Sequence, residues 1–415
     1  MLKIVVVANT PPPYRVPMYN RIAGTPGVDL HVIFCSRREP NRFWDLPPFE
    51  FSHTFLPERF VAAGERYIHN NIEVLPALKA ANADVIVTDG FNPTHLYAFL
   101  YTAFKRIPHI PMTDGTDVSE RALSVVHRIV RRFVFARSAA FLSASLGGKR
   151  LYMSYGIDAE RCFLSPLCAN NAAFTPPPGL RDKPFDFIFC SRMEPGKSPL
   201  FALDVAVETA RRLGRRTRIL FAGSGSLEQQ TRQTAAEHAG LVEAVFHGFA
   251  AQGDLPQLYQ SASMFLFPTL ADVWGVVVNE ACAAGLPVII SPYAGVVDEL
   301  VRDGENGFVR ELDVTQWADR AVRLLTDESM WHGFSRRSLE LVSNYTFDHA
   351  AAGVVDACSL ARSRDSEQDG SPRKKGRGAT VVERLADRRF ADGSTRSLDD
   401  RVMPASRSPG QRSSS

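Results

Sequence analysis

The sequence alternates short apolar runs with longer segments of helical period, and it does so in two series. The first series has apolar runs at residues 4–8, 30–35, 85–88, 109–112 and 140–143, and the second at 187–191, 218–222, 244–247, 265–267 and 288–291. A parallel strand that is buried on both faces gives such an uninterrupted apolar run, and helices between successive strands cover the sheet. The pattern predicts an α/β fold with two doubly wound, Rossmann-like domains.

A proline cluster separates the two series. Residues 166–179, PLCANNAAFTPPPG, cannot continue a helix or a central strand. A chain of 415 residues with 45% hydrophobic content is also too long for one ordinary core. We therefore predict a first domain at 1–165, a linker at 166–180 and a second domain at 181–344. Ligands of open parallel sheets bind at the carboxyl ends of the strands, so we expect the site in a cleft between the two domains.

Charge and cysteine content restrict the kinds of site. Residues 180–361 carry 16 Lys/Arg against 23 Asp/Glu, so any basic group that holds an anion there must be individually placed. No CxxC pair and no zinc-like spacing occurs, which predicts no metal site and buried thiols in a reducing compartment. The six cysteines are Cys35, Cys162, Cys168, Cys190, Cys282 and Cys358.

The two ends of the chain have different character. The apolar run after Met1 is too short for a signal peptide, and no 18 uncharged apolar residues occur together. We therefore expect a cytoplasmic protein, with peripheral contact to the inner face of a membrane as the alternative. Residues 362–415 are rich in Ser, Arg, Asp and Gly, a composition that predicts a disordered tail.

The most informative single stretch is residues 265–295, FLFPTLADVWGVVVNEACAAGLPVIISPYAG. It reads as a strand, a loop with Asp272, a helix from about 275 to 284 that Gly285 ends, and a second strand. Asp272 and Glu280 therefore flank a helix start, where free backbone amides favour an anion. The stretch predicts a site for an anion that carries hydroxyl groups.

This stretch resembles the signature of the family 4 retaining glycosyltransferases. The spacing from Asp272 to Glu280, followed by Ala281 and the run 285–288 (Gly-Leu-Pro-Val), is similar to their Glu-x7-Glu motif, with Asp in place of the first Glu. The resemblance implies the GT-B arrangement, a last helix at 345–361 that crosses back to the first domain, and a nucleoside-diphosphate sugar as donor without a further cofactor. It also implies that Glu280 holds the donor ribose and that Asp272 approaches the donor sugar. The alternative is a capping Asp before an amphipathic helix that carries a solvated Glu.

A second motif supplies positive charge. Arg192 and Lys197 lie in the loop CSRMEPGKSP between a strand and a helix, where two cations beside a helix N-terminus would neutralise a diphosphate. In the resembling family, the Gly-Arg-x4-Lys segment has this role. The backbone amides of Gly275, Val276 and Val277 would face the same phosphates. An ordinary surface loop is the alternative for Arg192 and Lys197.

Two further turns follow strands of the second series. Gly223 and Gly225 in FAGSGS would let the backbone approach a ligand, but a third glycine of the dinucleotide fingerprint is missing, which argues against a nicotinamide cofactor. The resemblance places this turn beside the donor, and His247 and Gly248 near its base. A partly buried histidine with a backbone partner is the alternative for His247.

The first series matches the family less closely. The loop after its first strand, NTPPPYR, resembles the start of family members from polysaccharide gene clusters, and its Arg15 would contact a phosphate or be a plain surface residue. Asp114, in MTDGTD, occupies about the position of a family histidine that touches the donor sugar. A turn with Asx-type hydrogen bonds explains the same residues without a function.

The segment 124–137, SVVHRIVRRFVFAR, has helical period. Its arginines, among them Arg128, Arg131 and Arg132, point toward one side, and Val125 and Ile129 toward another. A solvated basic face is one interpretation. A surface attracted to anionic lipid, where a lipid-linked acceptor would be found, is the other.

These observations favour a retaining glycosyltransferase that transfers a sugar to a saccharide or lipid-linked saccharide, in cell-surface polysaccharide or glycoconjugate synthesis. Its predicted catalytic residues are Asp272, Glu280, Lys197, Arg192 and Asp114. No Asp-x-Asp pair of the metal-dependent type stands at a strand end, so we expect a metal-independent reaction and no nucleic-acid partner. A nucleotide-sugar epimerase and an inactive donor-binding paralogue remain alternatives.

Overall fold

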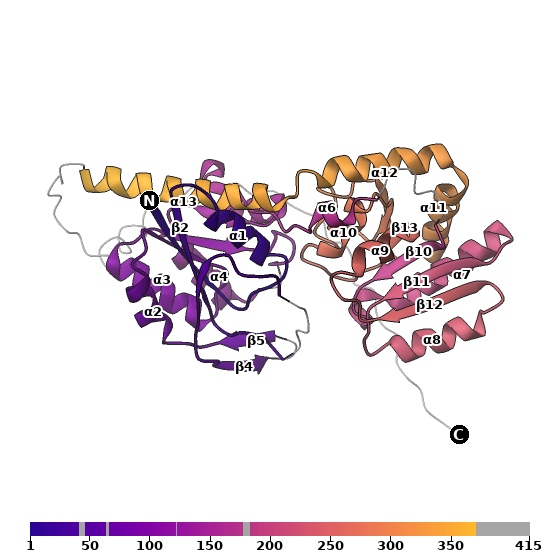
Figure 1. Cartoon of the computed structure of the whole chain (residues 1–415), viewed down its shortest axis with the longest axis horizontal. Coiled ribbons are helices and arrows are strands. Elements are labelled where there is room, and N and C mark those ends of the chain that lie inside the picture. The colour runs from indigo at the N-terminus through magenta and orange to yellow at the C-terminus, as the bar shows by residue number, and fades with distance from the viewer. Residues whose placement is uncertain (41–45, 64–65, 122, 177–182, 371–415) are drawn as a thin grey trace, which may run out of the picture. The chain divides into compact units, whose positions relative to one another are not determined.

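The computed structural model describes residues 1–40, 46–63, 66–121, 123–176 and 183–370. Residues Met1–Asp369 form one compact unit. It contains two separate all-parallel sheets with helices on their faces, so the predicted α/β class with two Rossmann-like sheets is confirmed (Figure 1).

The first sheet has seven strands in the order β3-β2-β1-β6-β7-β8-β9. Its strands are β1 (Leu2–Ala8), β2 (Val28–Phe34), β3 (Ser52–Phe55), β6 (Val85–Thr88), β7 (His109–Thr113), β8 (Phe141–Ser143) and β9 (Cys162–Leu164). A separate antiparallel hairpin is formed by β4 (Phe60–Ala63) and β5 (Arg66–His69). Central strands such as β6 are buried along their whole length, which explains why they read as continuous apolar runs.

The helices of this part connect the strands and cover both faces of the sheet. They are α1 (Val16–Ala23), α2 (Val74–Ala81), α3 (Pro93–Lys105), α4 (Val125–Phe135), α5 (Leu146–Ser154), η1 (Ala159–Arg161) and α6 (Asn171–Phe174). Helix α1 packs on one face of β1, through Tyr19 and Ile22, and α2 packs on the other, through Val74 and Leu78. The short α6 lies within the predicted linker, of which residues 177–180 are outside the described residues.

The second sheet has six strands in the order β12-β11-β10-β13-β14-β15. They are β10 (Phe185–Cys190), β11 (Thr217–Ala222), β12 (Val242–Gly248), β13 (Ala262–Phe267), β14 (Val288–Ile290) and β15 (Gly307–Val309). The accompanying helices are η2 (Pro195–Lys197), α7 (Pro199–Leu213), α8 (Glu228–Glu237), α9 (Leu255–Gln260), α10 (Val276–Ala283), α11 (Val314–Thr326) and α12 (Glu328–Val342). Helices α7 and α11 pack on one face of the sheet, and α9 and α10 on the other.

The last helix, α13 (Phe347–Gly370), packs against the first sheet, as the predicted crossover helix should (Figure 1). Gly353 allows this contact, because a Cβ there would lie 1.8 Å from the carbonyl oxygen of Leu164. The helix does not end near residue 361 as predicted but continues to Gly370. Arg362, at the start of the added part, donates to the carbonyl oxygen of Met1 at 3.2 Å and lies 3.6 Å from Asp84. The rest of the predicted tail, 371–415, is outside the described residues.

Two simpler expectations can also be compared with the structure. All six cysteines are buried, as predicted. Within the described part of the chain, no helix combines the length and the apolar character needed to span a bilayer.

Each sheet has one point where the strand order reverses. In the first sheet, β2 and β6 lie on opposite sides of β1, and in the second sheet, β11 and β13 lie on opposite sides of β10. Loops that leave such a pair of neighbouring strands in opposite directions open a crevice at the carboxyl ends of the strands. Residues of the loops after β1 and β6, and after β10 and β13, are therefore the first place to look for a site.

Candidate active site

Two loops meet at the reversal point of the second sheet. The loop after β10 carries Lys197 and the loop after β13 carries Asp272, and both leave the same edge because β10 and β13 are paired. The backbone N–H of Leu270 donates to the carbonyl oxygen of Gly196 at 2.9 Å, and the Thr269 hydroxyl contacts the same oxygen at 3.3 Å. These bonds hold the two loops together without any ligand.

Lys197 and Asp272 form an ion pair at this junction. The Lys197 Nζ lies 2.6 Å from Oδ2 of Asp272, 3.2 Å from Oγ1 of Thr269 and 3.3 Å from the carbonyl oxygen of Ala271. The other carboxylate oxygen of Asp272 accepts the backbone N–H of Trp274 at 3.1 Å. The predicted phosphate-binding cation and the predicted acid are therefore brought together, and each holds the other in place.

Arg192 lies at the start of the same loop and is exposed. Hydrogen bonds from the side chain and backbone of Ser226 lower the pKa of the neighbouring Glu194, and the charge of Arg192 adds to the effect. The loop thus has a second cation on its solvent side, but its predicted contact with a diphosphate stays a prediction.

The glycine turn after β11 packs closely on the loop after β10. A Cβ at Gly223, whose φ is +134°, would lie 2.0 Å from the carbonyl oxygen of Ser191, and one at Gly225 would lie 2.5 Å from that of Met193. Both glycines thus allow a close approach to the protein's own backbone, and their predicted contact with the donor stays a prediction. These glycines therefore shape the loop that carries Arg192.

The end of β12 is tied to this turn. The backbone N–H of Gly223 donates to the carbonyl oxygen of Gly248 at 2.7 Å. His247 is exposed, so the expectation of a partly buried histidine is wrong. The contact of His247 and Gly248 with a nucleotide base stays a prediction.

Helix α10 begins where the sequence predicts. Gly275 precedes it with a φ of +101°, a left-handed conformation that favours glycine, and Gly285 follows it with a φ of +69°. Val276 and Val277 are half-buried against the core, as expected for their side chains. Their backbone N–H groups lie in the first turn, where a helix offers no internal acceptor, so this end of α10 can receive an anion.

Glu280 is buried inside α10, with 7% of its surface exposed. Burial raises its pKa from 4.5 to about 7, and a hydrogen bond from the Tyr259 hydroxyl to Oε2, at 2.9 Å, offsets part of that effect. The alternative of a solvated glutamate is therefore wrong. A buried carboxyl group that titrates near neutrality is typical of functional sites.

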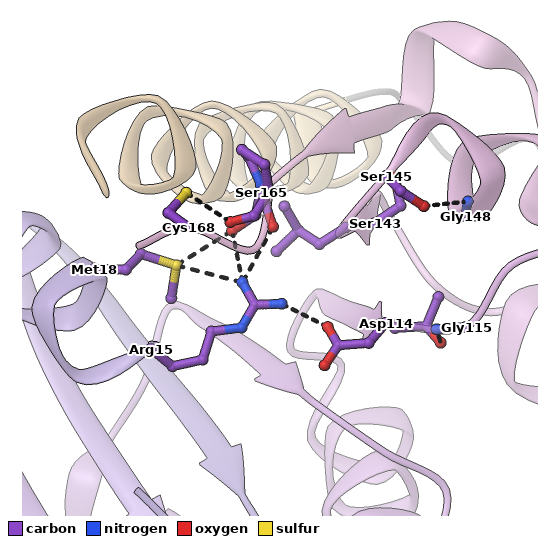
Figure 2. A network of polar contacts seen from close by, with 12 residues as sticks. Arg15, Met18, Asp114, Gly115, Ser143, Ser145, Gly148, Ser165 and Cys168 are labelled. Carbon is purple, nitrogen blue, oxygen red and sulfur yellow. Dashed lines mark hydrogen bonds and ion pairs between the residues drawn. The ribbon is translucent and has the colours of Figure 1, made fainter. Parts of the chain in front are cut away.

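A second polar cluster lies at the reversal point of the first sheet. Figure 2 shows the guanidinium of Arg15 between Asp114 and Ser165. Nη2 of Arg15 is 2.6 Å from Oδ1 of Asp114, and Nη1 donates to the carbonyl oxygen of Ser165 at 3.1 Å. Arg15 is only 4% exposed, so the expectation of a plain surface arginine is wrong. Burial opposes its charged form, but the charge of Asp114 and nearby tyrosines outweigh this and raise its pKa.

Asp114 therefore belongs with Arg15 at the first sheet. Its side chain is 45% exposed. The turn that follows is held by other hydroxyl groups, since Oγ1 of Thr113 accepts the N–H of Gly115 at 3.0 Å and Oγ of Ser119 accepts that of Thr116 at 2.9 Å. Asp114 is thus available at the surface of the cluster, and its predicted contact with a sugar is untested.

Arg15 and Asp114 line a cavity of about 160 Å³. Two further carboxylates line it, each beside a histidine: Glu39 is 3.0 Å from His69, and Asp89 is 3.0 Å from His95. Glu39 and Asp89 were not among the residues predicted from the sequence. Both follow predicted strands, 30–35 and 85–88, and the rule that ligands bind at the carboxyl ends of strands would have found them.

A larger hollow, of about 650 Å³, lies beside α12. Three of its charged groups pair with one another, because Arg337 lies 2.9 Å from Glu305 and 3.1 Å from Glu340. It is open and remote in the fold from both reversal points, and we do not consider it a candidate for the active site.

Part of the sequence is similar to the sequences of known proteins. A family model described as "Glycosyl transferases group 1" matches residues 171–340. A D-inositol 3-phosphate glycosyltransferase from Nocardia farcinica is 28% identical over 228 residues, which are 51% of this chain and 50% of that protein. The chain thus spans about half the length of the curated relatives that it matches.

Solved structures resemble a larger part of it. HepE from Anabaena, in complex with UDP, has a TM-score of 0.66 at 14% identity and covers 86% of this chain and 100% of its own. A glycosyltransferase from Rickettsia africae has a TM-score of 0.63 at 13% identity, covering 87% of this chain and 98% of its own. Residues 171–340 are therefore similar in sequence to the group 1 glycosyl transferases, and the described chain has the GT-B fold of solved glycosyltransferases.

Proposed function

We propose that this protein is a retaining glycosyltransferase that moves a sugar from a nucleoside-diphosphate sugar to a saccharide or lipid-linked saccharide. The observation that carries the proposal is the Lys197–Asp272 pair, 2.6 Å apart, which joins the loops after β10 and β13 within the matched residues 171–340. The UDP bound to the similar HepE structure agrees with a nucleotide donor.

The donor occupies the loops after β10 and β13 in this proposal. Lys197 and Arg192 neutralise the diphosphate, and the N-terminal amides of α10, at Gly275 and Val276, add backbone donors. Glu280 accepts hydrogen bonds from the ribose. Asp272 orients Lys197, to which it is already bonded, and faces the transferred sugar.

The acceptor occupies the cavity of the first sheet. Its volume of about 160 Å³ is below the roughly 300–1,000 Å³ of common small-molecule sites, so it suits one sugar ring better than a nucleotide. Its three carboxylates, Glu39, Asp89 and Asp114, each lie beside an arginine or a histidine, so the lining is rich in hydrogen-bonding groups. Such a lining suits hydroxyl groups.

The reaction breaks the bond between the anomeric carbon and the β-phosphate oxygen of the donor and forms one from the acceptor oxygen to the same face of that carbon. The departing phosphate oxygen takes the acceptor proton, so no protein nucleophile is required. Charge that develops on the diphosphate is stabilised by Lys197, Arg192 and the start of α10, fixed groups that replace water. With these groups the proposed reaction needs no metal ion.

The biological setting is proposed from the same resemblance. We place the reaction in the cytoplasm or at the inner face of a membrane, in the synthesis of cell-surface polysaccharide or glycoconjugate. The D-inositol 3-phosphate glycosyltransferases match this chain over about half of their own length, and we assign no acceptor from their names.

A panel of nucleoside-diphosphate sugars tests the proposal in two steps. A donor that binds the folded protein must raise its melting temperature, which selects the sugar and the base. The selected donor is then incubated with the protein and a panel of saccharide acceptors, and the product and its anomeric configuration are read by NMR. We expect a glycoside with the configuration of the donor.

Lys79→Ala, at an exposed lysine of α2, is the control for Lys197→Ala. Lys79→Ala should transfer sugar like the wild type, whereas Lys197→Ala should transfer it much more slowly. Conversion of the donor alone into its epimer would identify an epimerase instead. Donor binding without either product, over the whole acceptor panel, would favour the inactive paralogue.

A further inference from the structure

Helix α4 presents apolar side chains to solvent. Val126 is 68% exposed, Ile129 is 59% exposed and Phe133 is 45% exposed. Their spacing puts them on one side of the helix, and the opposite side packs into the core through Val134 and Phe135. Most amphipathic surface helices are oriented the other way, with the apolar stripe inside.

The neighbouring helix continues this surface. The ring of Phe99 in α3 lies 5.6 Å from that of Phe133 in α4, so the two helices are adjacent. One residue after Phe99, Leu100 is 52% exposed, and one turn later Phe104 is 81% exposed. Leu100, Phe104, Val126, Ile129 and Phe133 together define the α3–α4 face. Contiguous exposed apolar side chains of this kind mark an interaction surface.

Exposed basic residues lie on the same two helices and at their ends, and acidic residues are missing from this part of the sequence. No Asp or Glu occurs between Asp89 and Asp114 or between Glu120 and Asp158. The exposed cations of the two helices and their ends are Lys105, Arg106, Arg121, Arg128, Arg132 and Arg137. The guanidinium of Arg137 lies 4.2 Å from the ring of Phe133, so charge and apolar surface are in direct contact.

We propose that the α3–α4 face docks onto a lipid bilayer that contains anionic lipid. Its apolar side chains enter the boundary between head groups and acyl chains, and the surrounding Lys and Arg side chains meet the lipid phosphates. The proposal goes beyond the transfer reaction and is independent of it, because it rests on this surface alone. If the acceptor is lipid-linked, docking brings the enzyme to it.

Charge argues against residues 371–415 of the same chain as the occupant of the α3–α4 face. Residues 371–415 contain eleven Lys/Arg and five Asp/Glu, a net charge of +6, the same sign as the α3–α4 face. A segment of like charge is repelled by this surface, whereas an anionic bilayer is attracted.

Co-sedimentation of the full-length protein with vesicles tests the proposal. The vesicles are neutral phosphatidylcholine, or phosphatidylcholine with about one third phosphatidylglycerol, at low and at physiological salt. One double variant, Val126→Ser with Ile129→Ser, removes apolar contact. The other, Lys105→Gln with Arg132→Gln, removes two cations. Val61→Ser is the control for the first, since Val61 is also 68% exposed, and Arg336→Gln on α12 is a control for the second.

We expect binding to the anionic vesicles, weakened by salt, and little binding to the neutral ones. Neutralising two cations should weaken binding about 25-fold, or fivefold for each. The apolar double variant should also lose binding, while the control variants bind like the wild type. Transfer of sugar to a soluble acceptor should be unchanged in every variant, which separates this test from that of the proposed function.

Three results would overturn the proposal. The first is a wild-type protein that does not bind anionic vesicles at low salt. The second is undiminished binding by either double variant. Binding of this kind would mean that another surface or residues 371–415 contact the vesicles, or that the apolar side chains do not enter the bilayer. The third is a wild-type dimer that both double variants dissociate, which would make the α3–α4 face an interface between proteins.

Discussion

Replacing Glu280 by Gln should change how the stability of the protein depends on pH. Glu280 is buried in α10, and burial raises its pKa from 4.5 to about 7. The amide of Gln has nearly the same size and can still accept the hydrogen bond from Tyr259. The variant therefore removes the titration and leaves the packing in place.

The sign follows from the two pKa values. Between pH 4.5 and 7 the folded state keeps a proton that the unfolded chain has already released, so stability falls as pH rises through this window and is level above it. At 1.36 kcal/mol per pKa unit, the shift from 4.5 to about 7 corresponds to about 3 kcal/mol in total. Most of it, about 2 to 3 kcal/mol, falls between pH 5 and pH 8.5.

The assay is the melting temperature of both proteins at pH 5, 6, 7 and 8.5. The difference between variant and wild type cancels the other titrating groups that the two share. It should grow in favour of Glu280→Gln by about 2 to 3 kcal/mol as pH rises, at roughly 2–4 °C per kcal/mol for a cooperative unit of 150–250 residues. Glu237→Gln, at an exposed glutamate of α8, controls for the loss of one carboxylate.

Parallel curves for Glu280→Gln and wild type would refute this reasoning. They would mean that Glu280 titrates alike in the folded and unfolded states, and hence that its carboxyl group is hydrated in solution. A variant that is less stable by the same amount at every pH would show a packing defect instead, because a lost titration cannot be independent of pH.

Three further predictions concern the two polar clusters. Lys197→Ala should lower turnover by about 10²-fold or more, because it removes a fixed charge from the leaving diphosphate, while Lys79→Ala should not; rate measurements at saturating donor check this. Asp272→Asn should mainly lower turnover and leave donor affinity, measured by calorimetry, within a few-fold. Arg15→Ala should lower the free energy of unfolding by about 2–3 kcal/mol, because Asp114 and Ser165 lose a charged hydrogen-bond donor. Urea unfolding measures the last effect, and a change below about 0.5 kcal/mol would contradict it.

Most of the strands that the sequence predicted are buried on both faces, although the edge strand β12 was predicted and is partly exposed. Strand β6 has four buried residues in a row and is continuously apolar, so its sequence alone marks it. Strand β3 was missed because it reads Ser-His-Thr-Phe and is half exposed at the edge of the sheet. Strand β15 reads Gly-Phe-Val, and its glycine leaves only two apolar residues in a row. Edge strands that meet solvent or are very short lack the apolar signal on which such predictions depend.

The residues of the candidate site were predicted more completely than their contacts. Lys197 and Asp272 were placed separately, each in a loop after an apolar run. Their ion pair depends on β13 lying next to β10, although β11 and β12 intervene in the sequence. Strand order is decided by packing over the whole sheet, and a local pattern does not contain it. The Arg15–Asp114 pair was missed for the same reason, since β6 lies between β1 and β7.

Helix α4 shows a different limit, because its period identifies two faces but not which of them is buried. Arg131 shares the arginine side predicted from the sequence, yet it is buried, 2.6 Å from Glu120 and 4.4 Å from the ring of Phe91. Both partners come from other segments, and together they supply what a buried guanidinium requires, a counter-charge and a planar contact. With Arg131 held inside, the helix must turn Ile129 outward. The burial of Arg131 therefore accounts for the orientation of α4, and in the proposed docking a bilayer would remove the exposed surface of Ile129 from water.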